Sequence, residues 1–99
     1  MAAYWINTFR EIRDQARLAT YSELAGGIMQ SHGGRFLARG LPVRAYEAGV
    51  VERTTLIEFP SAASAIGAYE SDEYQAALRA LGDGAIRDIR IIEAVSDSS

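Results

Sequence analysis

The segment SHGGRFLARG, residues 31–40, marks the place where a helical pattern of residues gives way to a strand pattern. Gly33 is well placed to take the left-handed conformation that ends a helix, and Gly34 lets the chain turn back. From Arg35 onward, alternating residues predict a strand. The segment is therefore predicted to be a helix-to-strand junction first and a contributor of arginines to a pocket second.

On the N-terminal side of this junction, the sequence predicts one strand and one long helix. Residues 3–9 (AYWINTF) are rich in aromatic and β-branched residues, which favour a strand. From about residue 10 to residue 31 the spacing becomes helical, with an apolar stripe formed by Tyr21, Leu24, Ala25 and Ile28.

On the C-terminal side, Pro42 and Gly49 predict an irregular edge or hairpin, and residues 50–59 predict the clearest strand. Ser61 and Ser71 are predicted N-caps of two short consecutive helices. Residues 87–95 predict a last strand before a frayed tail at 96–99. This β-α-β-β-α-β order predicts one ferredoxin-like α+β domain over residues 1–99, an antiparallel sheet with its helices on one face.

The predicted strands leave apolar side chains on the sheet face without helices, namely Trp5, Leu37, Leu56 and Ile92. A contiguous apolar patch on such a face usually marks an interface. A chain of 99 residues also buries only about 60–65% of the surface that its unfolded form exposes, so its own core is small. We therefore expect a homodimer in which two sheet faces pack together.

Composition excludes several kinds of function. The chain has no cysteine and one histidine, which excludes disulfides and thiolate metal sites, and its acidic residues lack the spacing of a metal site. A net charge of −3 argues against nucleic-acid binding. No apolar run approaches the roughly 20 residues of a membrane helix, and the N-terminus lacks a signal-peptide pattern. We expect a soluble, cytoplasmic protein that uses no cofactor.

Four blocks of the sequence carry a resemblance to a known family: AYWI (3–6), HGGRFLARG (32–40), IEFPS (57–61) and YESDEYQ (69–75). Together they resemble the domain of unknown function 1330 family of the dimeric α+β barrel superfamily. The resemblance implies a ferredoxin-like protomer whose sheet packs on that of a partner. It implies no reaction, since the superfamily includes cofactor-independent monooxygenases, haem-degrading enzymes and an isomerase. The chain departs from the family pattern at four positions, namely Leu41, Ala68, Asp72 and Leu81.

One candidate site lies on a single strand face. Arg35 and Arg39 are predicted to share that face with Leu37, and neighbouring strands would add Trp5, Asn7, Glu58 and Arg90. Such a set suits an organic acid, with arginine for the carboxylate, tryptophan for an aromatic body and Glu58 for proton transfer. The alternative is an ion-pair network inside the dimer interface, which buried charges would require in any case.

A second candidate site lies between the helices and the sheet. His32, the only side chain that titrates near neutrality unaided, is a candidate general base there. The alternative for His32 is a structural role at the helix C-terminus, where it interacts with the helix dipole. The pocket would be lined by Tyr4, His32, Phe36, Phe59, Tyr69 and Tyr74.

Two functions remain open from the sequence. The first is the binding of a small anionic or aromatic metabolite, with His32 or Glu58 as catalytic candidates for a cofactor-free isomerase or monooxygenase. The second is a non-catalytic dimerising module. The residue types do not decide whether the chain is an enzyme.

Overall fold

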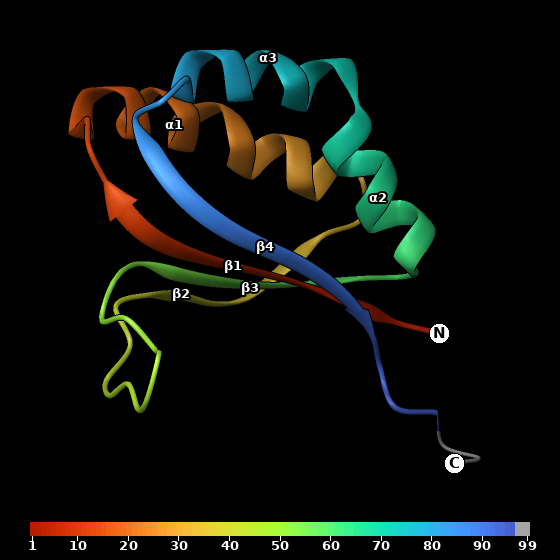
Figure 1. The fold of residues 1–99 in the computed structure, drawn as a ribbon. Coiled ribbons are helices and arrows are strands. Elements are labelled where there is room, and N and C mark those ends of the chain that lie inside the picture. Colours follow the sequence, from red (N-terminus) through yellow and green to blue (C-terminus); the bar gives the residue numbers. More distant parts are fainter. Residues whose placement is uncertain (97–99) are drawn as a thin grey trace.

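The computed structural model describes residues 1–96 and places them in a four-stranded sheet with three helices. The elements are β1 (Ala3–Ile12), α1 (Gln15–Ser31), β2 (Arg35–Gly40), β3 (Thr54–Phe59), α2 (Ala62–Glu70), α3 (Asp72–Leu81) and β4 (Ala85–Glu93). All neighbouring strands are antiparallel, in the order β2-β3-β1-β4, and the helices cover one face only (Figure 1). The predicted α+β class and topology are confirmed.

The junction between α1 and β2 is built as the sequence predicts. His32 ends α1, and its backbone N–H donates to the carbonyl of Met29 over 3.2 Å. Gly33 has a φ of 87°, in the left-handed region. A Cβ on Gly34 would lie 2.7 Å from the Met29 carbonyl oxygen and 3.0 Å from the ring of Phe59. Only glycine therefore fits this close approach of backbone and core.

Serine and aspartate side chains fix the helix starts. Ser61 and Ser71 accept hydrogen bonds from the backbone N–H groups three residues on, which confirms both predicted N-caps. The start of α1 was predicted too early, because Asp14 caps it by accepting from the N–H of Arg17 over 3.1 Å. The first strand accordingly runs to Ile12, through an irregularity between Phe9 and Glu11.

The predicted strand at 50–59 and irregular edge before it are corrected. Residues 41–53 contain no strand; they form a loop with a turn closed by Gly49 N–H and the Tyr46 carbonyl over 2.9 Å. The loop projects beyond the helix-free face of the sheet (Figure 1). The last strand begins at Ala85, opposite Ile12, because the longer β1 extends the pairing. From residue 97 on, the predicted tail lies outside the described residues.

The side of the sheet taken by Trp5 is the main correction to the predicted faces. Trp5 is 1% exposed beneath the helices, where its ring lies 5.8 Å from that of Tyr69 and 5.5 Å from that of Tyr74. The alternation along β1 was read correctly, but its two faces were exchanged. The large ring is buried because α2 and α3 bring further aromatic rings to it.

The apolar stripe predicted for α1 is also corrected. Leu24 of the predicted stripe is 46% exposed, whereas Leu18 and Met29, which were not predicted, are buried.

The helix-free side of the sheet is called here the open face. Its apolar residues alternate with the buried ones and include Ile6 and Leu56, which are paired across β1 and β3, and Ile92, which is paired with Tyr4. Leu56 and Ile92 therefore lie where they were predicted. Leu37 is 42% exposed within the register shift of β2 between Phe36 and Ala38.

Candidate functional site

A small cavity of about 40 Å³ lies between α1 and the sheet. Its walls are largely apolar and include Trp5 and Phe9, but two buried polar atoms belong to residues that line it. These atoms, Asn7 Oδ1 and Ser22 Oγ, have no hydrogen-bond partner among residues 1–96. Since a buried polar atom without a partner costs about 1–3 kcal/mol, a group that hydrogen-bonds to either atom would be stabilised in this cavity.

Two arginines stand at the mouth of this cavity. Arg39 and Arg53 line both the cavity and a wider groove of about 430 Å³ outside it. The Arg39 guanidinium lies 4.6 Å from the centre of the Phe36 ring, and that of Arg53 lies 5.8 Å from the Phe9 ring. Neither forms an ion pair within the described part of the chain. The mouth therefore presents two uncompensated positive charges beside aromatic faces.

The helix wall of the cavity is thinned by a glycine. Gly26 of α1 lines the cavity, and a Cβ built on it meets no atom within 4 Å. Gly27 beside it also has free space, but does not line the cavity. Glycine lowers helix stability relative to alanine. Gly26 therefore leaves room where a side chain would be tolerated and would stabilise the helix.

A buried polar network adjoins the cavity, because Tyr21 lines the cavity and also belongs to the network. The hydroxyl groups of Tyr21 and Tyr74 are 2.6 Å apart, and Arg87 Nη1 donates to them over 2.8 Å and 3.3 Å respectively. Burial, and then the nearby Tyr21, raise the pKa of Tyr74 above its ordinary value. Burial alone would lower the pKa of Arg87, but the two tyrosines raise it. At neutral pH the Tyr74 hydroxyl is thus protonated and the Arg87 guanidinium is charged.

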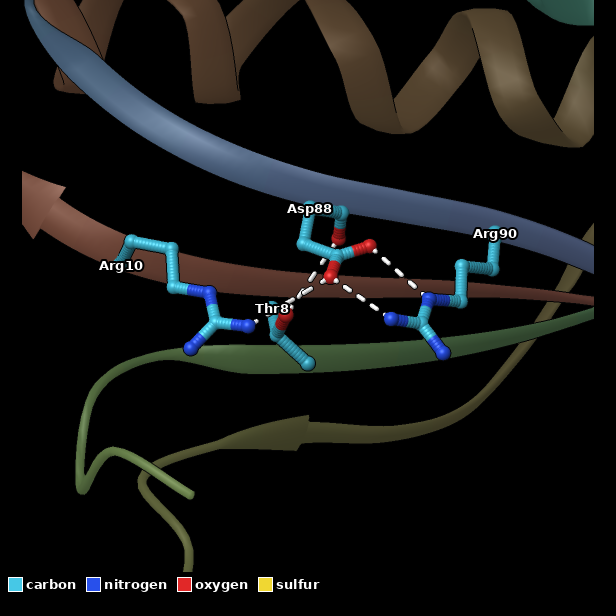
Figure 2. A network of polar contacts seen from close by, with 4 residues as sticks. All are labelled: Thr8, Arg10, Asp88 and Arg90. Carbon is cyan, nitrogen blue, oxygen red and sulfur yellow. Dashed lines mark hydrogen bonds and ion pairs between the residues drawn. The ribbon is translucent and has the colours of Figure 1, made fainter. Parts of the chain in front are cut away.

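The open face carries a different polar network, shown in Figure 2. Arg90 binds the Asp88 carboxylate through two hydrogen bonds of 3.2 Å, and Arg10 Nη2 lies 3.6 Å from the same carboxylate. These hydrogen bonds lower the pKa of Asp88. Thr8 also donates to the Asp88 backbone carbonyl over 3.4 Å. The Asp88 carboxylate thus forms ion pairs with both Arg10 and Arg90. The three residues line a wide hollow of about 520 Å³ beside the 41–53 loop.

The structure separates the residues that were predicted to share one arginine face. Arg35 and Glu58 form an ion pair of 2.9 Å on the open face, where Arg90 also lies. Trp5 and Asn7 lie beneath the helices instead, where they are 1% and 5% exposed. The predicted single face is therefore wrong, and the predicted ion pairing of Glu58 with an arginine is present.

Arg39 lies on the opposite face from the one predicted, because β2 is irregular. The register shifts between Phe36 and Ala38, so that Arg39 lies opposite Thr55, a buried residue of the cavity wall. Leu37 occupies the shift and lies opposite no residue of β3. An extra residue in a strand reverses the alternation beyond it. Arg39 thereby joins Asn7 at the cavity, on the helix side.

The second predicted site is also divided. Tyr69, Tyr74 and Phe59 gather around Trp5 in the core, and Phe36 lines the cavity. Tyr4 lies on the open face, opposite Glu58 and Ile92, so its predicted place in this pocket is wrong. His32 ends α1 and lines none of the cavities described here.

Sequence reasoning missed four residues that the structure brings to these sites: Tyr21 as a network member, Ser22, Arg53 and Arg87. Arg87 carried a usable signal, because it shares its strand alternation with Ile89 and Ile91 on the covered face. Ser22 carried a weaker one, since it directly follows Tyr21 of the predicted apolar stripe. Arg53 carried none, because it precedes β3 and its place depends on how the loop ends.

Comparison with known proteins then identifies the family. The model of the domain of unknown function family DUF1330 matches residues 2–95. The chain belongs to this family. No curated protein matches the DUF1330 chain significantly in sequence. Among residues 1–96, no helix is long and apolar enough to cross a membrane.

Solved structures share the fold of this DUF1330 chain. A protein of unknown function from Rhodopseudomonas palustris has 15% identity and a TM-score of 0.73, covering 96% of this chain and 83% of that one. A dimeric ferredoxin-like protein of unknown function from Thermobifida fusca has 15% identity and a TM-score of 0.64 (95% and 92% covered). A cofactor-independent oxygenase from Streptomyces nogalater has 12% identity and a TM-score of 0.61 (96% and 94% covered). At these identities the likeness shows the ferredoxin-like fold and no particular activity.

Proposed function

We propose that this protein binds a small aromatic acid in the cavity between α1 and the sheet. The observation that carries the proposal is the buried Asn7 Oδ1, in a cavity whose mouth holds Arg39 and Arg53. Within residues 1–96 this acceptor has no hydrogen-bond partner and the two arginines form no ion pair. A ligand with a hydroxyl group would donate to Asn7 Oδ1. Its carboxylate would pair with Arg39 and Arg53.

The chemistry of the walls supports an aromatic body between these two ends. Trp5, Phe9 and Phe36 line the cavity, and aromatic rings favour stacked or edge-on contacts with another ring. A phenol that carries a carboxylate, such as 4-hydroxybenzoate, therefore has the chemical groups that the site lacks. The pairing of Asn7 with one end of such a ligand and of the arginines with the other can be tested by removing one ligand group at a time.

The size of the cavity adds a condition. A cavity of about 40 Å³ holds only one to about three water molecules, so an aromatic ring enters only if side chains move. Phe36 and Arg39 are the side chains to move, because they belong to β2, which lies at the edge of the sheet and leaves Arg39 exposed. The arginine that draws the ligand would thus also open the site.

The proposal assigns binding and leaves the reaction to experiment. The cofactor-independent oxygenase among the structural neighbours supports testing cofactor-free isomerase or monooxygenase chemistry. His32 and Glu58 remain predictions as proton-transfer residues, although neither lines the cavity.

A second proposal concerns assembly. We propose that two copies pack through their open faces, because Ile6, Leu56 and Ile92 place apolar surface there and the 41–53 loop projects beyond the sheet (Figure 1). A structural neighbour is itself described as dimeric. If the chain only dimerises and binds no ligand, it is the non-catalytic module.

The binding proposal is tested by calorimetric titration with 4-hydroxybenzoate, benzoate and 4-hydroxybenzyl alcohol, with parallel light scattering. We expect 4-hydroxybenzoate to bind best, since it alone has both end groups. Gly26→Leu should abolish binding and Gly27→Leu should not, while Arg39→Ala should weaken binding by about tenfold without changing the mass. If no compound binds and Arg39→Ala lowers the mass, the dimerising module is the correct account.

A further inference from the structure

The network of Tyr21, Tyr74 and Arg87 has more hydrogen-bond donors than acceptors. Only one of the two hydroxyl hydrogens is used between the tyrosines, which are 2.6 Å apart. The other hydroxyl hydrogen, together with Arg87 Nε and Nη2, has no acceptor among residues 1–96. A guanidinium has five N–H donors and no acceptor, so Arg87 can still donate to a further acceptor.

The charge of the network is also unbalanced. Arg87 forms no ion pair with a carboxylate in the described part of the chain, whereas Arg10, Arg35 and Arg90 each do so on the open face. Arg87 is half-buried, and its guanidinium lies 4.8 Å from the centre of the Tyr21 ring. A half-buried positive charge without a counter-charge is costly, and an anion would relieve this cost.

Arg87 opens into a groove that can hold such an anion. The groove has a volume of about 650 Å³ and lies between α3 and β4, with walls formed mainly by Tyr69, Leu78, Leu81, Ile89 and Ile91. Ligand sites commonly have volumes of about 300–1,000 Å³. The groove shares no lining residue with the cavity beneath α1, and the two are joined only through the hydrogen bond from Arg87 to Tyr21, which lines that cavity.

The shape and chemistry of the walls define the rest of the ligand. Arg87, Ile89 and Ile91 follow one another on one face of β4, so the groove extends about 13 Å along the strand from the charge. The isoleucines and leucines offer aliphatic surface within a lining that also exposes polar groups. This combination fits an acid with an unbranched aliphatic chain.

We propose that the groove between α3 and β4 is a second ligand site, which binds an aliphatic carboxylate with its charged end on Arg87. The carboxylate accepts from Arg87 Nε and Nη2, and the chain lies along Ile89 and Ile91. The groove is distinct from the proposed aromatic-acid cavity, although Tyr21 lines that cavity and accepts from Arg87.

The test uses decanoate as the probe, with decanol as the uncharged control. Isothermal titration should show saturable decanoate binding, about tenfold or more weaker in Arg87→Met and weaker to a smaller extent in Tyr74→Phe, which keeps the ring. Arg79→Met is the matched control, because Arg79 lies exposed on α3 and does not line the groove. It should leave decanoate binding unchanged, and decanol should bind weakly to every variant.

A second measurement keeps the test decisive if Arg87→Met does not fold. In ¹⁵N-labelled wild-type protein, decanoate should shift the Arg87 Nε–H resonance and the backbone signals of Ile89 and Ile91. It should leave those of Asn7 and Gly26 unchanged, since these line the other cavity. Unsaturable binding, equal affinity of Arg87→Met, or shifts confined to the cavity beneath α1 would overturn the proposal. The proposal would also be overturned if a second copy of the chain covers the groove and decanoate does not displace it.

Discussion

Replacing Asn7 by leucine should make the protein more stable, which is unusual for a change at a residue that is 5% exposed. Leucine has the same branched skeleton as asparagine, with methyl groups where the amide has its oxygen and nitrogen, so Asn7→Leu creates no hole. The variant removes an acceptor that has no partner, Asn7 Oδ1. Since such an acceptor costs about 1–3 kcal/mol, we expect a gain of about 1–2 kcal/mol in the free energy of unfolding.

The gain is measured by urea denaturation and by thermal unfolding at one fixed protein concentration, because association would otherwise contribute. For a domain of this size each kcal/mol corresponds to about 4–8 °C in Tm. Thr8→Val is the matched control on the open face of the same strand. The Thr8 hydroxyl has a partner, donating to the Asp88 carbonyl over 3.4 Å, so this variant should gain nothing.

The same variant should lose ligand recognition. Without Asn7 Oδ1, 4-hydroxybenzoate should bind no better than benzoate, because its hydroxyl no longer finds this acceptor. Stability gained together with recognition lost is the expected behaviour of a binding residue. If Asn7→Leu instead destabilises the protein by 1 kcal/mol or more, the Asn7 amide is already satisfied and the reasoning behind the site is refuted.

Three further predictions follow from other parts of the structure. Gly26→Ala and Gly27→Ala should each stabilise the protein by about 0.5–1 kcal/mol in urea denaturation, because both glycines are helical and an added Cβ meets no atom within 4 Å. A loss of stability at either position would contradict the finding that a methyl group fits there. Burial raises the pKa of Tyr74 above the value of about 10 for an unfolded tyrosine, so its contribution to stability is complete below about pH 10 and declines as the pH rises further. Tyr74→Phe should lack this part of the decline when the free energy of unfolding is measured between about pH 8 and pH 11. Identical pH profiles for the variant and the wild type would contradict this prediction. Leu56→Asp on the open face should give a monomer in light scattering and Leu24→Asp on the exposed side of α1 should not; an unchanged mass for Leu56→Asp would place the interface elsewhere.

The parts of the fold that depend on neighbouring residues could be predicted. Gly33 turns the chain just after the end of α1, and Ser61 and Ser71 cap the starts of α2 and α3, because each acts on backbone groups within four residues. The order of strands and helices follows from such local signals. Asp14 was missed as an N-cap because the aromatic and polar residues before it continue β1 without a visible break.

The faces of the strands could be predicted only as pairs of alternatives. Alternation groups Trp5 with Asn7 and Tyr4 with Ile6, but it does not say which group the helices cover. That choice depends on the rings of Tyr69 and Tyr74, which are far along the chain. A register shift in β2 then places Arg39 on the opposite face from Arg35, and no local sequence pattern predicts this shift.

The polar network of Tyr21, Tyr74 and Arg87 could not be predicted from the sequence, because its members are also far apart along the chain. Tyr21 and Tyr74 are 53 positions apart and Arg87 is a further 13 positions away, yet their polar atoms meet in the core. The sequence identified Tyr74 as a candidate but gave it no partner. Only the packing of α1 and α3 over β4 brings the three together.

The central claim is that the cavity beneath α1 binds an aromatic acid. The most direct test is calorimetric titration of 4-hydroxybenzoate into the wild-type protein, Gly26→Leu and Gly27→Leu. The account predicts saturable binding to the wild type and to Gly27→Leu, and none to Gly26→Leu, whose side chain fills the cavity. Equal binding to all three proteins, or binding to none, would contradict it.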